Sequence, residues 1–171
     1  TGAGRGFSSG ADHKSAGSVP HIDGLTRPTF ALRSMEVLDD VILALRKLHQ
    51  PVIAAVNGAA IGLGCDVACM ADIRIASDKA KFGVTFLKLG LVPGDGGSWL
   101  LPRNVGYARA AEMLFTARSI DAATAAEWGL VNRVVAHDSL MDEALTTAAQ
   151  VEGGRLQMPE RLPDEEFDLP D

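Results

Sequence analysis

PVIAAVNGAAIGLGCDVACMADIRIAS, residues 51–77, is the stretch that decides the fold. Residues 51–56 are apolar and rich in β-branched side chains, and they lie between a proline and an Asn-Gly turn pair, which predicts a buried strand. The small apolar residues 63–71 predict a buried helix that carries one carboxylate, Asp66. Residues 72–76 alternate polar and apolar side chains and predict a second strand. The stretch therefore predicts an α/β fold.

The loop between this first strand and the helix, residues 57–64, is rich in glycine. It holds three glycines in eight residues, and glycine permits a positive φ and lets a ligand approach the backbone amides. The helix that follows presents unpaired N–H groups and the positive end of its dipole, which favour developing negative charge. An ordinary βαβ crossover, whose glycines serve only packing, is the alternative that this stretch leaves open.

Further elements are expected on both sides of this stretch. Residues 6–12 (GFSSGAD) indicate the end of a strand that turns into a loop, although a flexible glycine-rich arm is the alternative. Apolar residues at spacings of three and four predict an amphipathic helix over 29–49, after a loop at 15–28. After residue 77 we expect a short strand at 80–83, a glycine-rich loop at 89–97 leading into a helix at 98–101, helices at 109–116, 121–128 and 140–150, and a strand at 131–135.

Composition and charge limit the class of protein. The chain has 171 residues, of which 47% are hydrophobic and 22% charged, as in ordinary soluble domains. Its net charge of −6 argues against nucleic-acid binding. No apolar run approaches the roughly 20 residues that span a bilayer, and no signal peptide is evident, so we expect a cytoplasmic protein without membrane partners.

Charge also divides the chain. We expect a core over residues 1–150 and an acidic, proline-containing tail over 151–171, where seven acids and two bases give a net charge of −5. The two cysteines, Cys65 and Cys69, are one helical turn apart in the apolar helix and lack the spacing of a metal site. We therefore expect buried thiols and no metal.

Four motifs follow one another in a characteristic order. They are GRGFSSGAD (residues 4–12), PVIAAVNGAAIGLGCD (51–66), ADIRIASDKAKFG with GLVPGDGG (71–83 and 90–97), and LFTARSIDAATAAEWGLVNRVV (114–135). Together they resemble the crotonase family, the enoyl-CoA hydratase/isomerase superfamily, from Gly4 to about Ala149. The resemblance implies a crotonase-like (ClpP/crotonase) fold, a spiral of β-β-α units, and assembly into homotrimers or hexamers. Family members carry further segments before the position of Thr1 and after that of Gln150, so we expect either that the sequence omits these segments or that the protein is an incomplete paralogue.

A substrate site follows from the same resemblance. The substrate would be an acyl-CoA thioester whose carbonyl oxygen lies in an oxyanion hole between the backbone amides of Ala11 and Leu63. No separate cofactor is expected, because coenzyme A is part of the substrate. The other residues expected to contact the substrate are Ser9, Gly10, Asp12, Gly62 and Phe86.

The acids of this site depart from the pattern of the family's hydratases. Those enzymes use two glutamates, and the matching positions here hold Asp66 and Phe86. Phenylalanine transfers no proton, so hydration by two carboxylates cannot proceed in its usual form. Asp95, in GLVPGDGG, is the other acid expected near the site. It is predicted either to be catalytic or to cap the following helix.

The sequence therefore predicts an acyl-CoA enzyme of the hydratase/isomerase group, in which Asp66 or Asp95 moves protons while an enolate is stabilised. Two alternatives stay open. One is a catalytically silent acyl-CoA-binding or scaffold protein. The other is an isomerase or hydrolase that works with a single acid.

Overall fold

A computed structural model of the chain describes residues 1–10, 40, 42–45 and 47–153, and all structural statements below concern these residues. Its strands are β1 (Gly6–Ser8), β2 (Ile53–Val56), β3 (Ala59–Ile61), β4 (Ile73–Ser77), β5 (Lys81–Gly83), β6 (Ser119–Asp121) and β7 (Arg133–Val135). Its helices are α2 (Leu63–Met70), α3 (Gly97–Val105), α4 (Tyr107–Thr116), α5 (Ala122–Glu127) and α6 (Leu140–Gly153), with short 3-10 helices η1 (Phe86–Leu89) and η2 (His137–Ser139).

The strands form two sheets, one in the order β1-β3-β5-β6 and one in the order β2-β4-β7. All neighbouring strands run parallel except β5 and β6. The chain places β2 in one sheet and β3 in the other before it forms α2, and it repeats this with β4, β5 and the helices η1 and α3. Because β2 pairs with β4 and β3 with β5, the second unit stacks beside the first, which confirms the predicted spiral of β-β-α units.

The core follows from the alternation of side chains along these strands. Ala54 and Val56 of β2 face one large apolar cluster, which also contains α2, α3 and the second sheet. Ala55 and Ile75 face the other way, toward Leu140 and Ala144 of α6. The sheet containing β2 is therefore covered on both sides, which explains why its strands are almost continuously apolar.

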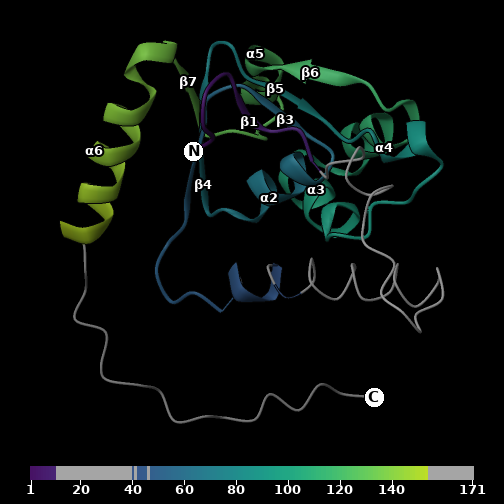
Figure 1. Cartoon of the computed structure of the whole chain (residues 1–171), viewed down its shortest axis with the longest axis horizontal. Coiled ribbons are helices and arrows are strands. Elements are labelled where there is room, and N and C mark those ends of the chain that lie inside the picture. The colour runs from purple at the N-terminus through teal and green to yellow at the C-terminus, as the bar shows by residue number, and fades with distance from the viewer. Residues whose placement is uncertain (11–39, 41, 46, 154–171) are drawn as a thin grey trace, which may run out of the picture.

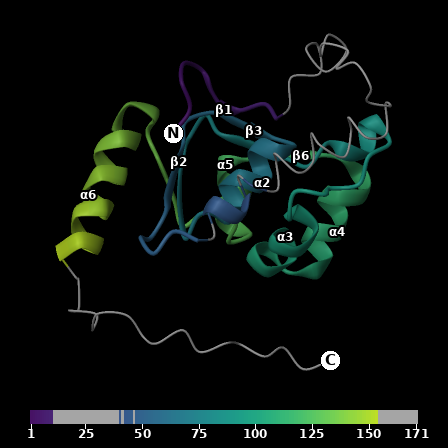
Figure 2. The same cartoon turned by 60° about the horizontal axis from the view of Figure 1, so that its bottom comes forward.

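The helices divide between the two sides of the molecule. Helix α6 packs against β2 and β4, whereas α3 packs between α2 and α4. Figures 1 and 2 both show α6 at one edge of the molecule and the α3–α4 pair at the opposite edge. Among the described residues, no helix is long and apolar enough to cross a bilayer.

Asn57 fastens the first residues of the chain. Its buried amide group donates to the carbonyl oxygens of Gly2, Gly4 and Gly6 at 3.3, 3.0 and 3.3 Å, and its Oδ1 accepts from the Gly2 N–H at 3.1 Å. β1 begins at Gly6 and pairs with β3. The N-terminal glycines are thus held against the body, so the flexible-arm alternative is wrong for residues 1–10.

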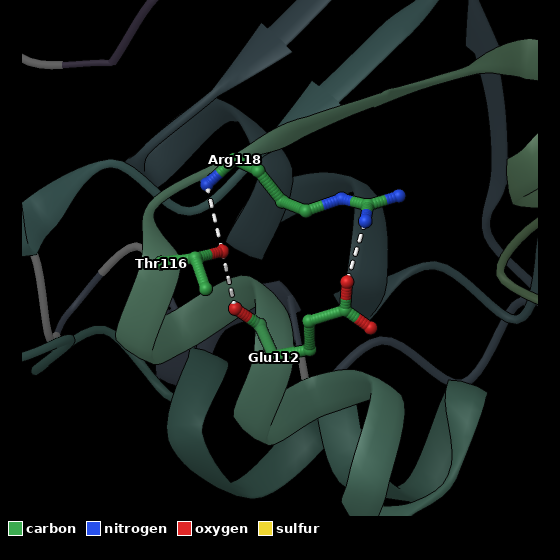
Figure 3. A network of polar contacts seen from close by, with 3 residues as sticks. All are labelled: Glu112, Thr116 and Arg118. Carbon is green, nitrogen blue, oxygen red and sulfur yellow. Dashed lines mark hydrogen bonds and ion pairs between the residues drawn. The ribbon is translucent and has the colours of Figure 1, made fainter.

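Helix α4 ends in a small polar network, drawn in Figure 3. The Thr116 hydroxyl donates to the Glu112 carbonyl oxygen at 2.6 Å and accepts from the Arg118 N–H at 3.3 Å, and Arg118 pairs with the Glu112 carboxylate at 2.5 Å. Between them Ala117 takes a left-handed conformation with φ of 51°, which ends the helix. The chain then turns into β6.

Several expectations about the elements need correction or lie outside the described residues. Residues 57–64 were expected to be one loop, but they include β3, and β6 was not expected. The predicted loop at 15–28 lies outside the described residues, as do most of the predicted helix at 29–49, of which residues 42–45 are helical, and the tail beyond residue 153.

Candidate active site

The first turn of α2 is the centre of the site. Gly62 precedes the helix with φ of 57°, a left-handed value that favours glycine, and its N–H donates to the Gly83 carbonyl oxygen at 2.8 Å. This bond ties the start of α2 to the end of β5. Leu63 is the first helical residue, so its N–H has no acceptor within the helix and can donate to a ligand.

The end of β1 lies against this same turn. A Cβ on Gly64 would lie 2.2 Å from the Ser8 carbonyl oxygen, so the two backbones touch. A Cβ on Gly10 would lie 3.5 Å from the Leu63 nitrogen. Gly10, the last described residue of this segment, therefore lies beside the Leu63 amide.

The remaining predicted residues of the β1 loop are less fully described. Ser9 is exposed, and the Gly10 N–H donates to the Ser8 hydroxyl at 3.3 Å, which closes the turn. Ala11 and Asp12 lie outside the described residues. The Ala11 amide and the Asp12 contact therefore stay predictions.

Asp66 lies three residues after Leu63, in the first turn of α2. Its side chain is 1% exposed, and neither carboxylate oxygen has a hydrogen-bond partner among the described residues. Burial, with a further contribution from the charge of Asp95, raises the pKa of Asp66 to about 7. A carboxyl group with that pKa exchanges its proton readily near neutral pH.

Asp95 lies in the loop before α3 and is also buried, at 4% exposure. Its charge acts on Asp66, so the structure brings together the two acids that the sequence singled out. The cap position of α3 is held by Gly96, with φ of 88°, and not by Asp95. The capping alternative for Asp95 is therefore wrong.

Gly97, the first residue of α3, fits against Asp66 and was not singled out by the sequence. A Cβ on Gly97 would lie 2.1 Å from Asp66 Oδ1 and 2.6 Å from Oδ2. Only glycine leaves room for the carboxylate there. The Gly-Gly pair at the end of GLVPGDGG indicated a close approach of the backbone to another group. That this group is the Asp66 carboxylate on α2 could be known only from the fold.

Phe86 and Thr85 lie at the start of η1, after β5. Phe86 is partly buried and packs against the main core. Thr85 was not predicted. Its Oγ1 lies 3.9 Å from the place a Cβ on Gly62 would take, which puts a hydroxyl beside the start of α2.

Known proteins resemble this chain in sequence. The model of the enoyl-CoA hydratase/isomerase family matches residues 1–158. A probable enoyl-CoA hydratase, echA12 of Mycobacterium bovis, is 58% identical over 154 residues, which are 90% of this chain and 54% of that protein. The chain thus spans about half the length of the curated relatives it matches.

Solved structures resemble it in fold as well. A probable enoyl-CoA hydratase/isomerase from Mycobacterium abscessus superposes with a TM-score of 0.81 at 49% identity, covering 91% of this chain and 57% of that one. A monofunctional enoyl CoA isomerase from M. smegmatis superposes with a TM-score of 0.66 at 50% identity, covering 71% of this chain and 57% of that one. By motif order, spiral fold and these similarities, the chain belongs to the enoyl-CoA hydratase/isomerase family.

Proposed function

We propose that this chain carries the proton-transfer centre of an enoyl-CoA isomerase, which moves a double bond from the β,γ to the α,β position of an acyl-CoA thioester. The observation that carries the proposal is the buried Asp66, which lies close enough to a second acid, Asp95, for the charge of Asp95 to raise its pKa. By the family resemblance, Phe86 holds the position of the second glutamate of the family's hydratases, so no second glutamate is expected to act with Asp66. Isomerisation needs one group that takes a proton and gives it back. Hydration also needs general acid–base catalysis that activates a water molecule.

The ionised Asp66 carboxylate takes a proton from the α-carbon, and the electrons of that C–H bond pass into a dienolate whose charge rests on the thioester oxygen. The Leu63 amide, and in this proposal the Ala11 amide, donate hydrogen bonds to that oxygen. The protonated Asp66 then returns the proton to the γ-carbon, and the conjugated thioester forms.

Asp95 has a supporting part in this proposal. Its charge adds to the effect of burial and raises the proton affinity of Asp66, so Asp66 is strong enough as a base and still partly ionised near neutral pH. A relative of known structure, 50% identical to this chain, is described as a monofunctional enoyl CoA isomerase, which agrees with a single working acid. Coenzyme A enters as part of the substrate. A cytoplasmic location, and a trimeric or hexameric assembly as the resemblance implies, belong to the same proposal.

The test compares a 3-enoyl-CoA with crotonyl-CoA. We expect isomerisation of the 3-enoyl-CoA, seen as growth of the conjugated-thioester absorbance, and little hydration of crotonyl-CoA. D66N is expected to lower kcat by roughly 10²–10⁴-fold, because the proton carrier is removed. D95N is expected to retain turnover and to move the pH midpoint of kcat/KM downward, because the neighbouring charge that raises the pKa of Asp66 is lost.

Other outcomes contradict the proposal in different ways. Rapid hydration of crotonyl-CoA would show that a hydratase works without an acid at position 86. Binding of both thioesters without turnover of either would support a silent acyl-CoA-binding protein. Binding of neither would remove the acyl-CoA assignment.

A further inference from the structure

Asn57 anchors the first residues of the chain, which lead into the candidate active site. Its side chain is buried, at 8% exposure, and makes four hydrogen bonds to backbone groups of Gly2, Gly4 and Gly6. These three residues alternate along the chain, and the last of them begins β1. A buried amide whose oxygen and nitrogen are both engaged holds the backbone around it in one arrangement.

The pairing of β1 with β3 does not by itself fix the place of β1 in the sheet. The strand has three residues, and its register shifts between Gly6, which pairs with Ala59, and Ser8, which pairs with Ala60. Register is weakly specified in glycine-rich strands, and a slip by one residue moves a strand by about 3.3 Å. The four hydrogen bonds of Asn57 are therefore well placed to fix the register.

The same segment ends beside the first turn of α2. A Cβ on Gly58 would lie 2.1 Å from the Arg5 carbonyl oxygen, so the two backbones touch next to Asn57. At the other end, a Cβ on Gly10 would lie 3.5 Å from the Leu63 nitrogen. Residues 5–10 thus lie along residues 58–63, with Asn57 at one end and the Leu63 amide at the other. The backbone therefore carries a shift of the segment at Asn57 to Gly10.

We propose that Asn57 is a positioning residue for the site that binds the thioester oxygen. By fixing the register of β1, it holds the segment that includes Gly10 in place beside the Leu63 amide, and it acts through the backbone and not on the substrate. This inference rests on the proposed function, in which the Leu63 amide donates to the thioester oxygen. A misplacement of about 1 Å can cost about 10²-fold in rate, so a slip of β1 by one residue would disable the site.

The experiment measures two effects of N57A, which removes all four hydrogen bonds. The first is on the isomerisation of a 3-enoyl-CoA. We expect kcat to fall about tenfold or more and KM to change less, because the oxygen is held more tightly in the transition state than in the substrate. The second is on the absorption of bound 4-(dimethylamino)cinnamoyl-CoA, a conjugated thioester that absorbs at longer wavelength when hydrogen bonds polarise its carbonyl group. We expect the wild type to shift this absorption to longer wavelength and N57A to lose most of the shift.

N132A is the matched control. The Asn132 side-chain oxygen accepts from the Arg74 N–H at 2.8 Å, so this variant also loses a hydrogen bond from an asparagine to backbone, but at the other sheet. Urea unfolding measures the stability of both variants, and N132A should lose stability while it keeps kcat and the absorption shift. If N57A does not fold, N57S takes its place, because serine keeps a hydroxyl group in the buried site.

Failure of this inference and failure of the proposed function give different results. The absorption shift needs no proton transfer, so it is measured whether or not the protein turns over a substrate. If no 3-enoyl-CoA is turned over, but the wild type shifts the absorption and the Asn57 variant does not, the inference stands and the isomerase proposal falls. If the Asn57 variant loses stability but keeps the shift, Asn57 is merely structural and the inference is overturned, while turnover by the wild type leaves the isomerase proposal standing. A wild type that gives no shift has no polarising site for Asn57 to position, which also overturns the inference.

Discussion

At the scale of single residues, two glycines differ in what they contact, because one faces a side chain and the other faces backbone. Gly97 leaves room for the Asp66 carboxylate, and Gly64 leaves room for the Ser8 backbone. A side chain can move aside by rotation, whereas a backbone moves only with its strand. Changes at the two glycines should therefore affect activity and stability in different proportions.

G97A is expected to lower kcat at least tenfold, because the new Cβ displaces the Asp66 carboxylate and a small misplacement of a reacting group is costly. Its free energy of unfolding should change little, since alanine favours a helix and only one side chain must move. G64A is expected to lose about 2 kcal/mol or more, through backbone overpacking. The measurements are 3-enoyl-CoA turnover and urea unfolding.

G153A is the control for both variants, because no atom lies within 4 Å of the place its Cβ would take. It should leave turnover and stability near the wild-type values. If G97A turned over its substrate at the wild-type rate, the carboxylate beside Gly97 would have no part in catalysis.

The unusual pKa of Asp66 predicts how stability depends on pH. Its pKa is about 7 in the folded chain and about 4 when unfolded, so the folded chain holds this proton more tightly. This group therefore stabilises the fold below about pH 4, and the contribution is lost as the pH rises to about 7. The total loss is roughly 4 kcal/mol.

Urea unfolding of the wild type and D66N at a series of pH values isolates this effect. The wild type should lose stability relative to D66N across that range, because asparagine does not titrate. Parallel stability curves would show that Asp66 is ionised with an ordinary pKa in the folded chain.

The acids of the site could be named from the sequence, because a carboxylate in an apolar helix and one in a glycine-rich loop are visible as patterns. That the two acids lie close together was expected only from the family resemblance, and the contacts of Gly97 and Thr85 were not expected at all. Those depend on the packing of α2 against α3 and β5, which no local pattern records.

At the scale of elements, the helices α2, α5 and α6 were predicted closely. Helix α2 ends one residue from its expected end, and α5 begins after Asp121, whose side chain accepts from the Thr124 N–H at 2.8 Å as an N-cap. The strands β3 and β6 have three residues each and were missed, because β3 lies in a glycine-rich segment that is typical of a loop and β6 directly precedes α5. Their pairing with neighbouring strands, and not their own sequence, makes them strands.

Arg74 of β4 joins elements that are distant in sequence. Its buried guanidinium donates to the Leu130 carbonyl oxygen at 2.6 Å, to the Asn104 side-chain oxygen at 3.2 Å and to the Ala71 carbonyl oxygen after α2. R74M keeps much of the volume but removes every donor, so buried acceptors lose their partners. We expect a loss of about 3 kcal/mol in the free energy of unfolding.

The control for this prediction is R103M, at an exposed arginine whose guanidinium stacks on the Trp99 ring at 3.5 Å. It should cost less than about 1 kcal/mol, as exposed contacts do. Urea unfolding measures both variants, and equal losses would show that the buried guanidinium does not hold these elements together.

At the scale of the whole molecule, the main cluster connects both sheets with α2 and α3, so α2 should open only when the core opens. Cys65 and Cys69 of α2 report on this, because both are free and buried, at 0% and 4% exposure. The hydrogen bond with Cys69, together with burial, raises the pKa of the Cys65 thiol and makes it still less reactive.

Labelling with a thiol reagent in increasing urea is the test. Both thiols should react slowly in the native protein, with the same urea dependence as global unfolding. C65A and C69A each leave one reporter, so the two rates can be read separately. Fast labelling of either thiol without urea dependence would mean that α2 opens by itself.

The close fit of Asp66 and Gly97 has an evolutionary consequence. A glutamate at position 66 would need room for one more methylene where α3 already fills the space, so we expect that D66E alone does not confer hydration of crotonyl-CoA. Substitutions at these two sites should be strongly epistatic, with double variants departing from the sum of the single effects. Any lineage that exchanged one acid for the other would have needed to adjust the facing helix at the same time.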